Sequence, residues 1–315
     1  MTIQDFLTTE VHSVVISGHV NPDGDCLGSC MALRLYLKKA CPGLDVQVLL
    51  EKPREEIAFL EGVDSIISED TGLEPDLFIL LDCADSERIG FAAETFKRAR
   101  HSLCIDHHVD HGTSAEQAVI KSTYGSCAEV LYELLDPAYL DKAIAEALYL
   151  AIIQDTGVFQ YSNARPETLR IAADLMTYGI DTATIVYDSF TSRTFKQSKI
   201  LGYCLDHCIR FAHDKAVIMV LDEATMAAYE ARRPDLGEVV SAMRLIKGIE
   251  VSVFAYPLKD GVFKVSFRSA RYLDVNALAN QFGGGGHIRA AGASLEGTAD
   301  TVRETLMKAV EKELQ

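Results

Sequence analysis

Acidic residues and histidines occur at four points of this sequence where an apolar run ends, within the segments HVNPDGD, LDCAD, IDHH and QDTG. These segments supply His19, Asp23, Asp25, Asp82, His107 and Asp155. Four carboxylates with two imidazoles suit Mn²⁺ best, with Mg²⁺, Co²⁺ or Fe²⁺ as the other candidates. Because so many acids would repel one another in one crevice, they would need bound cations. We therefore expect two divalent metal ions, whose charge balances that of the four carboxylates.

The chemistry that two adjacent metals support is phosphoryl transfer. They can lower the pKa of a shared water and hold the attacking and leaving oxygens of an in-line displacement. Asp23 and Asp25 flank the permissive Gly24, so we expect an extended pair that points one carboxylate at each metal. Each motif alone has a plainer interpretation, since Asp-Gly-Asp is commonly a turn, and Asp82 with Asp85 could cap a helix. Those interpretations do not explain why all the motifs follow apolar runs.

A second candidate site is the glycine-rich segment GGGGHIRAAG near the end of the chain. Its glycines include Gly284, Gly285 and Gly286. Backbone N–H groups without side chains around them can approach an anion, and His287 adds a positive donor. Arg268, Ser269 and Arg271 lie upstream and could complete a phosphate-binding face. The segment fits neither a Walker loop nor a dinucleotide fingerprint, and a flexible hinge or tight helix packing stays an equal alternative.

The elements that must position these residues alternate between strands and helices in the first half of the chain. Apolar runs of strand length are Val11–Gly18, Asp45–Leu50, Asp76–Cys83 and Ser102–His107. Helical patterns cover Cys26–Lys39, Ser126–Leu135 and Asp141–Gln154, and another helix begins at Pro166. This alternation predicts an α/β fold with a mostly parallel sheet covered by helices on both faces. The acids and histidines would then converge at the carboxyl edge of that sheet, where such folds bind ligands.

The second half predicts a smaller α+β unit after a helical connector. Expected strands are Ala216–Leu221, Val251–Leu258 and Val262–Ser269, the last two forming a hairpin, and expected helices are Asp274–Gln281 and Thr301–Leu314. We place a metal-binding catalytic domain at 1–188, the connector at 189–209 and a substrate-binding domain at 210–315.

Composition narrows the function. The 315 residues are 48% hydrophobic, which suffices for a core, and a formal charge of −16 disfavours long duplex nucleic acid and anionic membranes as partners. A small phosphate ester stays open, because bound cations can reverse the sign of one pocket. No signal peptide or spanning segment is evident, and the eight cysteines indicate reduced core residues of a cytoplasmic protein. The pairs Cys26/Cys30 and Cys204/Cys208 leave zinc as a minor alternative.

The motifs HVNPDGDCLGS, LDCAD, IDHH and QDTGVF, in this order, resemble the four motifs of the DHH phosphoesterase family. GGGGHIRAAG resembles the hallmark of the DHH-associated domain that follows them. Length and the FRS…GGGGH arrangement are most similar to the small bacterial oligoribonucleases, or nanoRNases, that also dephosphorylate 3′-phosphoadenosine 5′-phosphate. Related members cleave linear or cyclic diadenylate.

The resemblance implies a role for each matching residue. His19 and Asp23 would hold one metal, Asp25, His107 and Asp155 the other, and Asp82 would bridge them. His108 would contact the scissile phosphate, with Asp106 and Asp85 orienting the site. Arg268, His287 and the glycines would bind the far end of the substrate.

Several functional alternatives remain at this stage. The expected substrates are short oligoribonucleotides or small nucleotide phosphates, and oligomeric state stays open, with a homodimer among the options. A diadenylate phosphodiesterase is the main rival. A manganese-dependent pyrophosphatase would need a C-terminal Ser-Arg-Lys-Lys-Gln type of motif, which the sequence lacks, and a non-catalytic nucleotide-binding module would be expected to have lost some of the ligands.

Overall fold

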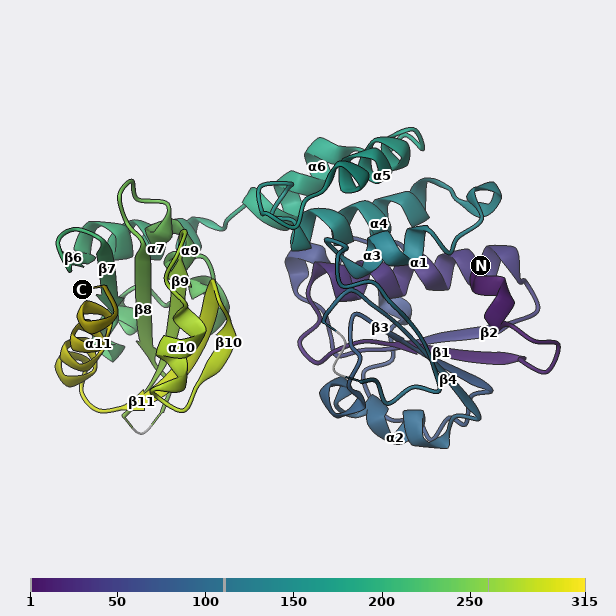
Figure 1. The fold of residues 1–315 in the computed structure, drawn as a ribbon, viewed down its shortest axis with the longest axis horizontal. Coiled ribbons are helices and arrows are strands. Elements are labelled where there is room, and N and C mark those ends of the chain that lie inside the picture. Colours follow the sequence, from purple (N-terminus) through teal and green to yellow (C-terminus); the bar gives the residue numbers. More distant parts are fainter. Residues whose placement is uncertain (1, 110–111, 260, 315) are drawn as a thin grey trace. The chain divides into compact units, whose positions relative to one another are not determined.

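The computed structural model describes residues 2–109, 112–259 and 261–314, and the chain divides into two compact units, Met1–Ser192 and Arg193–Gln315 (Figure 1). The division falls inside the segment 189–209, for which the sequence predicts one helical connector. A π-helix, η6 (Tyr187–Thr191), ends before the division, and α7 (Phe195–His207) begins after it. The helix is interrupted because Thr194 caps α7, its side chain accepting a hydrogen bond from Gln197 N.

The first unit contains, among the described residues, a five-stranded sheet in the order β2-β1-β3-β4-β5. Every neighbouring pair is parallel. The strands are β1 (Ser13–Ser17), β2 (Asp45–Leu49), β3 (Leu77–Leu81), β4 (His101–Asp106) and β5 (Gln117–Ile120). All residues of β3 are buried, as expected for a central strand covered on both faces. The predicted parallel α/β sheet is confirmed, and β5 is an additional edge strand.

Helices cover both faces of this sheet (Figure 1). They are α1 (Gly24–Ala40), α2 (Ala92–Arg98), α3 (Cys127–Tyr132), α4 (Lys142–Asp155), α5 (Pro166–Met176) and α6 (Thr182–Val186). On one face α1 packs closely on α4, and Gly28 makes this approach feasible, because a Cβ there would lie 2.4 Å from Ala147 O. The other face is covered by α2, where Ala92 joins a core with Phe78 and Leu80.

The second unit contains, in its described part, a mixed six-stranded sheet in the order β10-β11-β9-β8-β7-β6. Its strands are β6 (Ile209–Phe211), β7 (Ala216–Val220), β8 (Val251–Pro257), β9 (Val262–Ser269), β10 (Gly285–His287) and β11 (Ala290–Glu296). The predicted hairpin is the antiparallel β8–β9 pair, and Asp260 in its turn lies outside the described residues. The glycine run is not only a loop, because Gly285 and Gly286 form part of β10 at the sheet edge.

Two layers of helices enclose this second sheet. Besides α7 they are α8 (Glu223–Ala228), α9 (Val239–Arg244), α10 (Val275–Asn280) and α11 (Ala299–Leu314). Leu278 of α10 and Leu306 of α11 belong to one hydrophobic core, and Ile200 of α7 and Val240 of α9 belong to another. Most of the segment predicted as a connector is therefore part of the second unit.

Short 3₁₀ turns connect several elements: η1 (Ile3–Phe6), η2 (Glu55–Ile57), η3 (Val63–Ser65), η4 (Ser86–Ile89), η5 (Pro137–Tyr139) and η7 (Arg233–Leu236). Among the described helices, none combines the length and apolar composition that crossing a membrane requires.

Candidate metal centre

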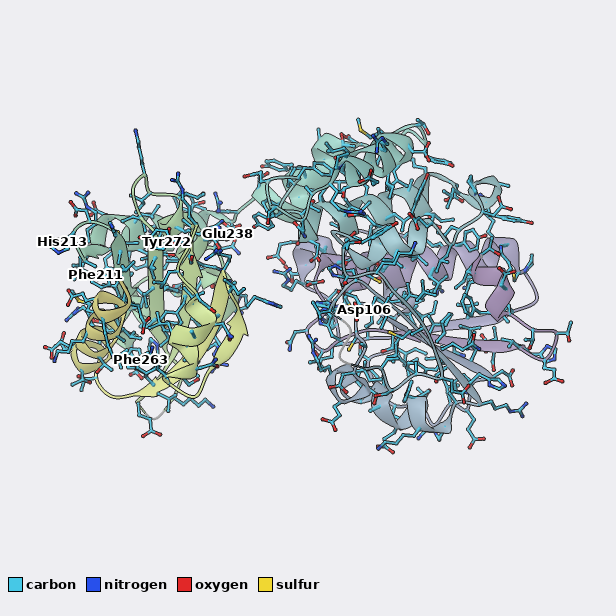
Figure 2. All side chains as sticks on the ribbon, in the orientation of Figure 1. Asp106, Phe211, His213, Glu238, Phe263 and Tyr272 are labelled. Carbon is cyan, nitrogen blue, oxygen red and sulfur yellow. The ribbon has the colours of Figure 1, made fainter. Side chains whose placement is uncertain are left out.

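Neighbouring parallel strands of the first unit bring the predicted ligands together at their carboxyl ends. His19 follows β1, Asp82 follows β3, and His107 follows Asp106, the last residue of β4, which is labelled in Figure 2. Since β1, β3 and β4 are adjacent and parallel, their ends meet at one edge of the sheet. Three strands therefore supply acids or histidines to one place.

Two groups of three side chains have ligand atoms within 4.8 Å of one another. The His19 triad consists of His19, Asp23 and Asp82, and the His107 triad consists of Asp25, His107 and Asp155. In the His107 triad, His107 Nε2 lies 3.1 Å from Asp155 Oδ2 and 3.7 Å from Asp25 Oδ2. In the His19 triad, His19 Nε2 lies 3.7 Å from Asp23 Oδ1.

Asp82 is a member of the His19 triad that also faces His107 of the other triad. Its Oδ2 is 3.4 Å from His19 Nε2, and its Oδ1 is 3.4 Å from His107 Nε2, so each carboxylate oxygen faces one triad. The residue has a φ of 56°, which is unusual for a side chain other than glycine. A strained backbone at the end of a strand is a common feature of functional sites. The geometry agrees with a carboxylate that serves both triads.

Asp23 and Asp25 are not the extended pair that the sequence predicts. Asp23 is the N-cap of α1 and accepts hydrogen bonds from Asp25 N and Cys26 N, both at 3.1 Å, whereas Asp25 lies in the first turn of the helix. Gly24 is helical, and a Cβ there would lie 2.1 Å from Gln154 Cγ. The glycine is therefore needed for packing against the end of α4 and not for an extended backbone.

Asp25 is held by the N-terminus of α3. The side chain is fully buried, and its oxygens accept hydrogen bonds from Cys127 N at 2.6 Å, Ala128 N at 3.1 Å and Ser29 Oγ at 3.2 Å. Backbone N–H groups at a helix N-terminus favour a negative charge. The carboxylate is therefore fixed in orientation before any ligand binds.

Backbone carbonyls orient the two imidazoles. His19 Nδ1 lies 2.9 Å from Val20 O, and His107 Nδ1 lies 3.2 Å from Tyr124 O. Because a carbonyl oxygen only accepts, each Nδ1 carries the hydrogen and each Nε2 is left to face the carboxylates. This is the arrangement in which a histidine binds a metal through Nε2.

His108 has a different partner. Its Nδ1 lies 2.8 Å from Asp106 Oδ1, which also accepts hydrogen bonds from His107 N at 2.7 Å and from His108 N at 3.2 Å. The hydrogen bond to Asp106 raises the pKa of His108 and outweighs the opposing effect of burial. Asp85, in contrast, belongs to neither triad and caps η4 by accepting from Glu87 N.

The cluster requires positive charge. Burial disfavours a charged imidazole, yet contacts with Asp23 and Asp82 raise the pKa of His19 to about 12. Burial likewise lowers the pKa of His107, but contacts with Asp155 and Asp82 outweigh it and raise the pKa to about 12. Burial and the charges of Asp82 and Asp155 raise the pKa of Asp25 well above its usual value.

Unpartnered buried atoms test whether a metal fits. Asp82 Oδ1, Asp106 Oδ2 and His107 Nε2 are buried and have no hydrogen-bond partner among the described residues. Such orphaned atoms are rare in folded proteins and call for a missing ion or water. Oxygen and imidazole donors at these positions fit a divalent cation. The described cysteines belong to no metal-binding group and are free, which removes the support for zinc.

Glu129 supports the site although it belongs to none of the four sequence motifs. Glu129 is fully buried and accepts hydrogen bonds from Gly125 N at 3.1 Å, Arg165 Nη2 at 3.0 Å and Thr168 Oγ1 at 3.0 Å. Gly125 follows Tyr124, whose carbonyl orients His107. The sequence does contain a signal for it, because Ser126-x-x-Glu129 is a capping pattern, and Ser126 Oγ accepts from Glu129 N.

The residues of the second candidate site all lie in the second unit. Ala290 pairs with both Arg268 and His287, so β9 and β10 bring these two side chains to the same end of the sheet. Gly284 packs tightly, since a Cβ there would lie 2.1 Å from Gly292 O. Ser269 is fully buried and donates to Glu250 Oε1 at 3.0 Å, so it faces the core. Glu250 was not predicted from sequence.

Comparison with known proteins places the two units. The model of the DHH family N-terminal domain matches residues 13–152, and that of the DHHA1 domain matches residues 214–315. The bifunctional oligoribonuclease and PAP phosphatase NrnA of Thermus thermophilus is 30% identical over 96% of this chain and 90% of its own length. The Bacillus subtilis protein of the same name is 26% identical over 90% of this chain and 89% of its own.

A solved structure has the same fold along most of the chain. The exopolyphosphatase-related protein from Bacteroides fragilis superposes with a TM-score of 0.88 at 23% identity, covering 97% of this chain and 94% of its own. The first unit, with its two triads around Asp82, is thus a DHH domain, and the second is a DHHA1 domain. The chain belongs to the DHH phosphoesterase family.

Proposed function

We propose that this chain is a phosphoesterase dependent on two divalent metals that hydrolyses short oligoribonucleotides and 3′-phosphoadenosine 5′-phosphate. The observation that carries the proposal is the position of Asp82, with one carboxylate oxygen toward each triad. The similarity to proteins named oligoribonuclease and PAP phosphatase supports this substrate class. The arrangement of the candidate metal ligands supports hydrolysis of a phosphate ester, and the names of the relatives suggest which esters.

The metals are proposed to be Mn²⁺, because carboxylates outnumber imidazoles in both triads and no thiolate is present. One ion would be held by His19 and Asp23, the other by Asp25, His107 and Asp155, with Asp82 shared. Bound there, the ions would supply Lewis-acid stabilisation and an activated water for attack on phosphorus.

The protein's own groups would orient and protonate the substrate. Asp106 fixes His108 through Nδ1, and this hydrogen bond raises the pKa of His108 and so favours the protonated imidazole. We propose that His108 donates from Nε2 to a phosphate oxygen or to the leaving group. Asp85 would have only an indirect role, because it holds η4, the turn that follows the strand end carrying Asp82.

The second unit would bind the rest of the substrate. Arg268, Arg271 and His287 supply positive charge, and Gly284 to Gly286 allow close approach of a phosphate to the backbone. Ser269 would act by holding Glu250 rather than by touching substrate.

A substrate panel tests this function. Purified protein is incubated with Mn²⁺ or with EDTA, and product is measured from a 5′-labelled diribonucleotide, 3′-phosphoadenosine 5′-phosphate, linear and cyclic diadenylate, and pyrophosphate. We expect metal-dependent release of mononucleotide from the diribonucleotide and of phosphate from the bisphosphate. Faster release from pyrophosphate than from any nucleotide, or no product with Mn²⁺, would overturn the proposal. Faster cleavage of diadenylate would replace the substrate class.

A further inference from the structure

The second unit contains a cavity that is lined by only one of the substrate-binding residues predicted from the sequence, Arg271. Its volume is about 450 Å³, within the usual range for ligand sites. It lies where β7 and β8 begin and β9 ends, and four cationic side chains line it: Lys215, Arg244, Lys247 and Arg271. We call this cavity the basic pocket. Figure 2 labels Phe263, which lies near the start of β9, and Tyr272, which follows the end of β9 and lines the pocket.

The lining of the basic pocket has an excess of positive charge, with four cations and one carboxylate. None of the four cations forms an ion pair with a described carboxylate, whereas Lys39, Lys97 and Arg98 of the first unit each do. Arg244 Nε is buried without a hydrogen-bond partner among the described residues. Like charges gathered around one cavity repel each other, so an anion would relieve a cost that the free protein carries.

The single carboxylate in the lining is already occupied. Glu250 Oε1 accepts hydrogen bonds from Arg271 N at 3.2 Å, Tyr272 N at 2.8 Å and Leu273 N at 2.9 Å, as well as from Ser269 Oγ. Glu250 therefore shapes the wall of the pocket with one oxygen held by these donors, and its single negative charge is outnumbered by the four cations. This leaves the cationic side chains available to a ligand.

The mouth of the pocket has an apolar surface as well. Tyr272 is 58% exposed and Leu245 is 76% exposed, and both line the cavity. Exposed aromatic side chains beside cations are the usual platform for stacking a nucleobase, and the cations bind the attached phosphate. A simple inorganic anion would not require these two residues, whereas a nucleotide would use both features.

We propose that the basic pocket binds one nucleoside phosphate unit, with its phosphate on Arg244 and Lys247 and its base on Tyr272. That this unit belongs to an oligoribonucleotide substrate rests on the proposed function. The pocket shares a sheet edge with Arg268, since both lie at the end of β9. It would therefore favour oligonucleotides over a single bisphosphate nucleotide.

Binding is measured without turnover, so that the test is independent of catalysis. The probe is 5′-fluorescein-labelled tetra-adenylate, its anisotropy is titrated with full-length protein in EDTA, and unlabelled AMP, adenosine and inorganic phosphate compete. The charge variant is R244Q/K247Q. Its matched control is K308Q/K312Q, which removes two exposed lysines from α11 of the same unit.

We expect the charge variant to raise the Kd of the probe about tenfold and the control to change it less than about twofold. Tyr272→Leu should weaken binding about tenfold through lost stacking, with AMP competing better than adenosine or phosphate alone. Equal Kd values for wild type and R244Q/K247Q, with thermal unfolding unchanged, would overturn the proposal that the basic pocket binds a nucleotide. Adenosine competing as well as AMP would overturn the phosphate contact, and an unaffected Tyr272→Leu would overturn the base contact.

An activity assay separates this inference from the proposed function. With Mn²⁺, R244Q/K247Q should raise KM for the tetranucleotide and leave KM for 3′-phosphoadenosine 5′-phosphate within about twofold. If no substrate is hydrolysed by the wild type, the proposed function fails while the anisotropy result still decides the pocket. Equal rises of KM for both substrates would show that the pocket does not distinguish an oligonucleotide and would refute that part of the inference.

Discussion

Asp25 in the first unit and Glu250 in the second are both buried carboxylates held by backbone N–H groups. Their surroundings differ, because Asp25 belongs to an acidic cluster and Glu250 to a cavity lined mainly by cations. The N-terminus of α3 fixes Asp25, which remains turned toward His107 and the other acids. The chain from Arg271 to Leu273 takes up Glu250 Oε1, and this leaves a cavity dominated by cations. The same device thus builds an acidic centre in one unit and a basic one in the other.

We expect the first unit to determine metal binding and the rate of the chemical step, and the second unit to determine substrate affinity. Asp25 and Asp82 of the acidic cluster are buried, and the cluster has ligand atoms without a hydrogen-bond partner among the described residues, so changes there should act on metal binding and kcat. Most cationic side chains of the second unit are exposed, and the described candidate metal ligands all belong to the first unit, so changes there should act on KM. Four substitutions test whether the division holds.

The largest effect is expected for Asp82→Asn. An amide cannot present a charged oxygen to each triad, so we expect kcat to fall by roughly 1000-fold and the metal content to drop below two ions per chain. Stopped assays and elemental analysis of the dialysed protein measure these quantities. Asp64→Asn, an exposed position of the same unit, is the control. A kcat within tenfold of wild type would contradict the shared role of Asp82.

A smaller loss is expected for Glu129→Gln, which touches no ligand directly. The amide would weaken the bonds to Gly125 N and Arg165 and loosen the turn whose carbonyl orients His107. We expect metal affinity to fall roughly 10- to 100-fold, with kcat recovering at high metal concentration. Calorimetric titration with Mn²⁺ gives the affinity, and Glu61→Gln is the exposed control. Unchanged affinity alongside lowered stability would reduce Glu129 to a purely structural residue.

Arg268→Ala should affect substrate affinity and leave the metal centre unchanged. We expect KM for a diribonucleotide to rise about tenfold while kcat and metal content stay within about twofold of wild type. Lys308→Ala in α11 is the control for loss of a positive charge from the same unit. A fall in kcat without a change in KM would mean that the second unit takes part in the chemical step, and the contrast between the units would be lost.

The smallest effect on turnover is expected for Glu250→Gln, whose main consequence is pH-dependent stability. Burial would raise the pKa of Glu250, but hydrogen bonds from Leu273, Tyr272 and Arg271 outweigh it and lower the pKa. A carboxyl whose pKa is lowered by folding stabilises the protein above its unfolded pKa, and this stabilisation is lost as the pH falls through the folded value. Wild-type protection of residues 250–273 should therefore decline in acid.

The variant should lack that acid-dependent part and lose about 2 kcal/mol of local stability at pH 7. Hydrogen exchange of peptides from 250–273 at pH 7 and in acid measures it, with Glu304→Gln as the exposed control. The same acid dependence in Glu250→Gln and wild type would assign the effect to another group.

The sequence predicts the acidic centre better than the basic one for a physical reason. Apolar runs such as β3 fix where a parallel strand ends, and the residue that follows, here Asp82, must lie at the ligand-binding edge. No comparable pattern connects Lys215, Arg244 and Lys247, which come from different connecting segments and meet only through tertiary packing. Backbone donors are equally invisible, because the N–H of Cys127 that holds Asp25 leaves no trace in residue type.

Local sequence patterns also predict some backbone conformations wrongly. Gly24 reads as a permissive turn residue, but its role is to accommodate the side chain of Gln154, a contact from far along the chain. Gly285 and Gly286 read as a loop, whereas pairing with β11 makes them an edge strand. The supposed connector has helical spacing throughout, yet the cap at Thr194 divides it. In each case a partner distant in sequence, or a cap, overrides the local preference.

The close packing at Gly28 also constrains the order of assembly. Asp155 is the last residue of α4, and α4 reaches its place only by docking on α1 against that glycine. The residues of the His19 triad have all been synthesised once the chain reaches Asp82, whereas the His107 triad must wait until α4 has been synthesised and docked. The two triads are therefore completed at different times, and the second one requires α1 and α4 to be packed together.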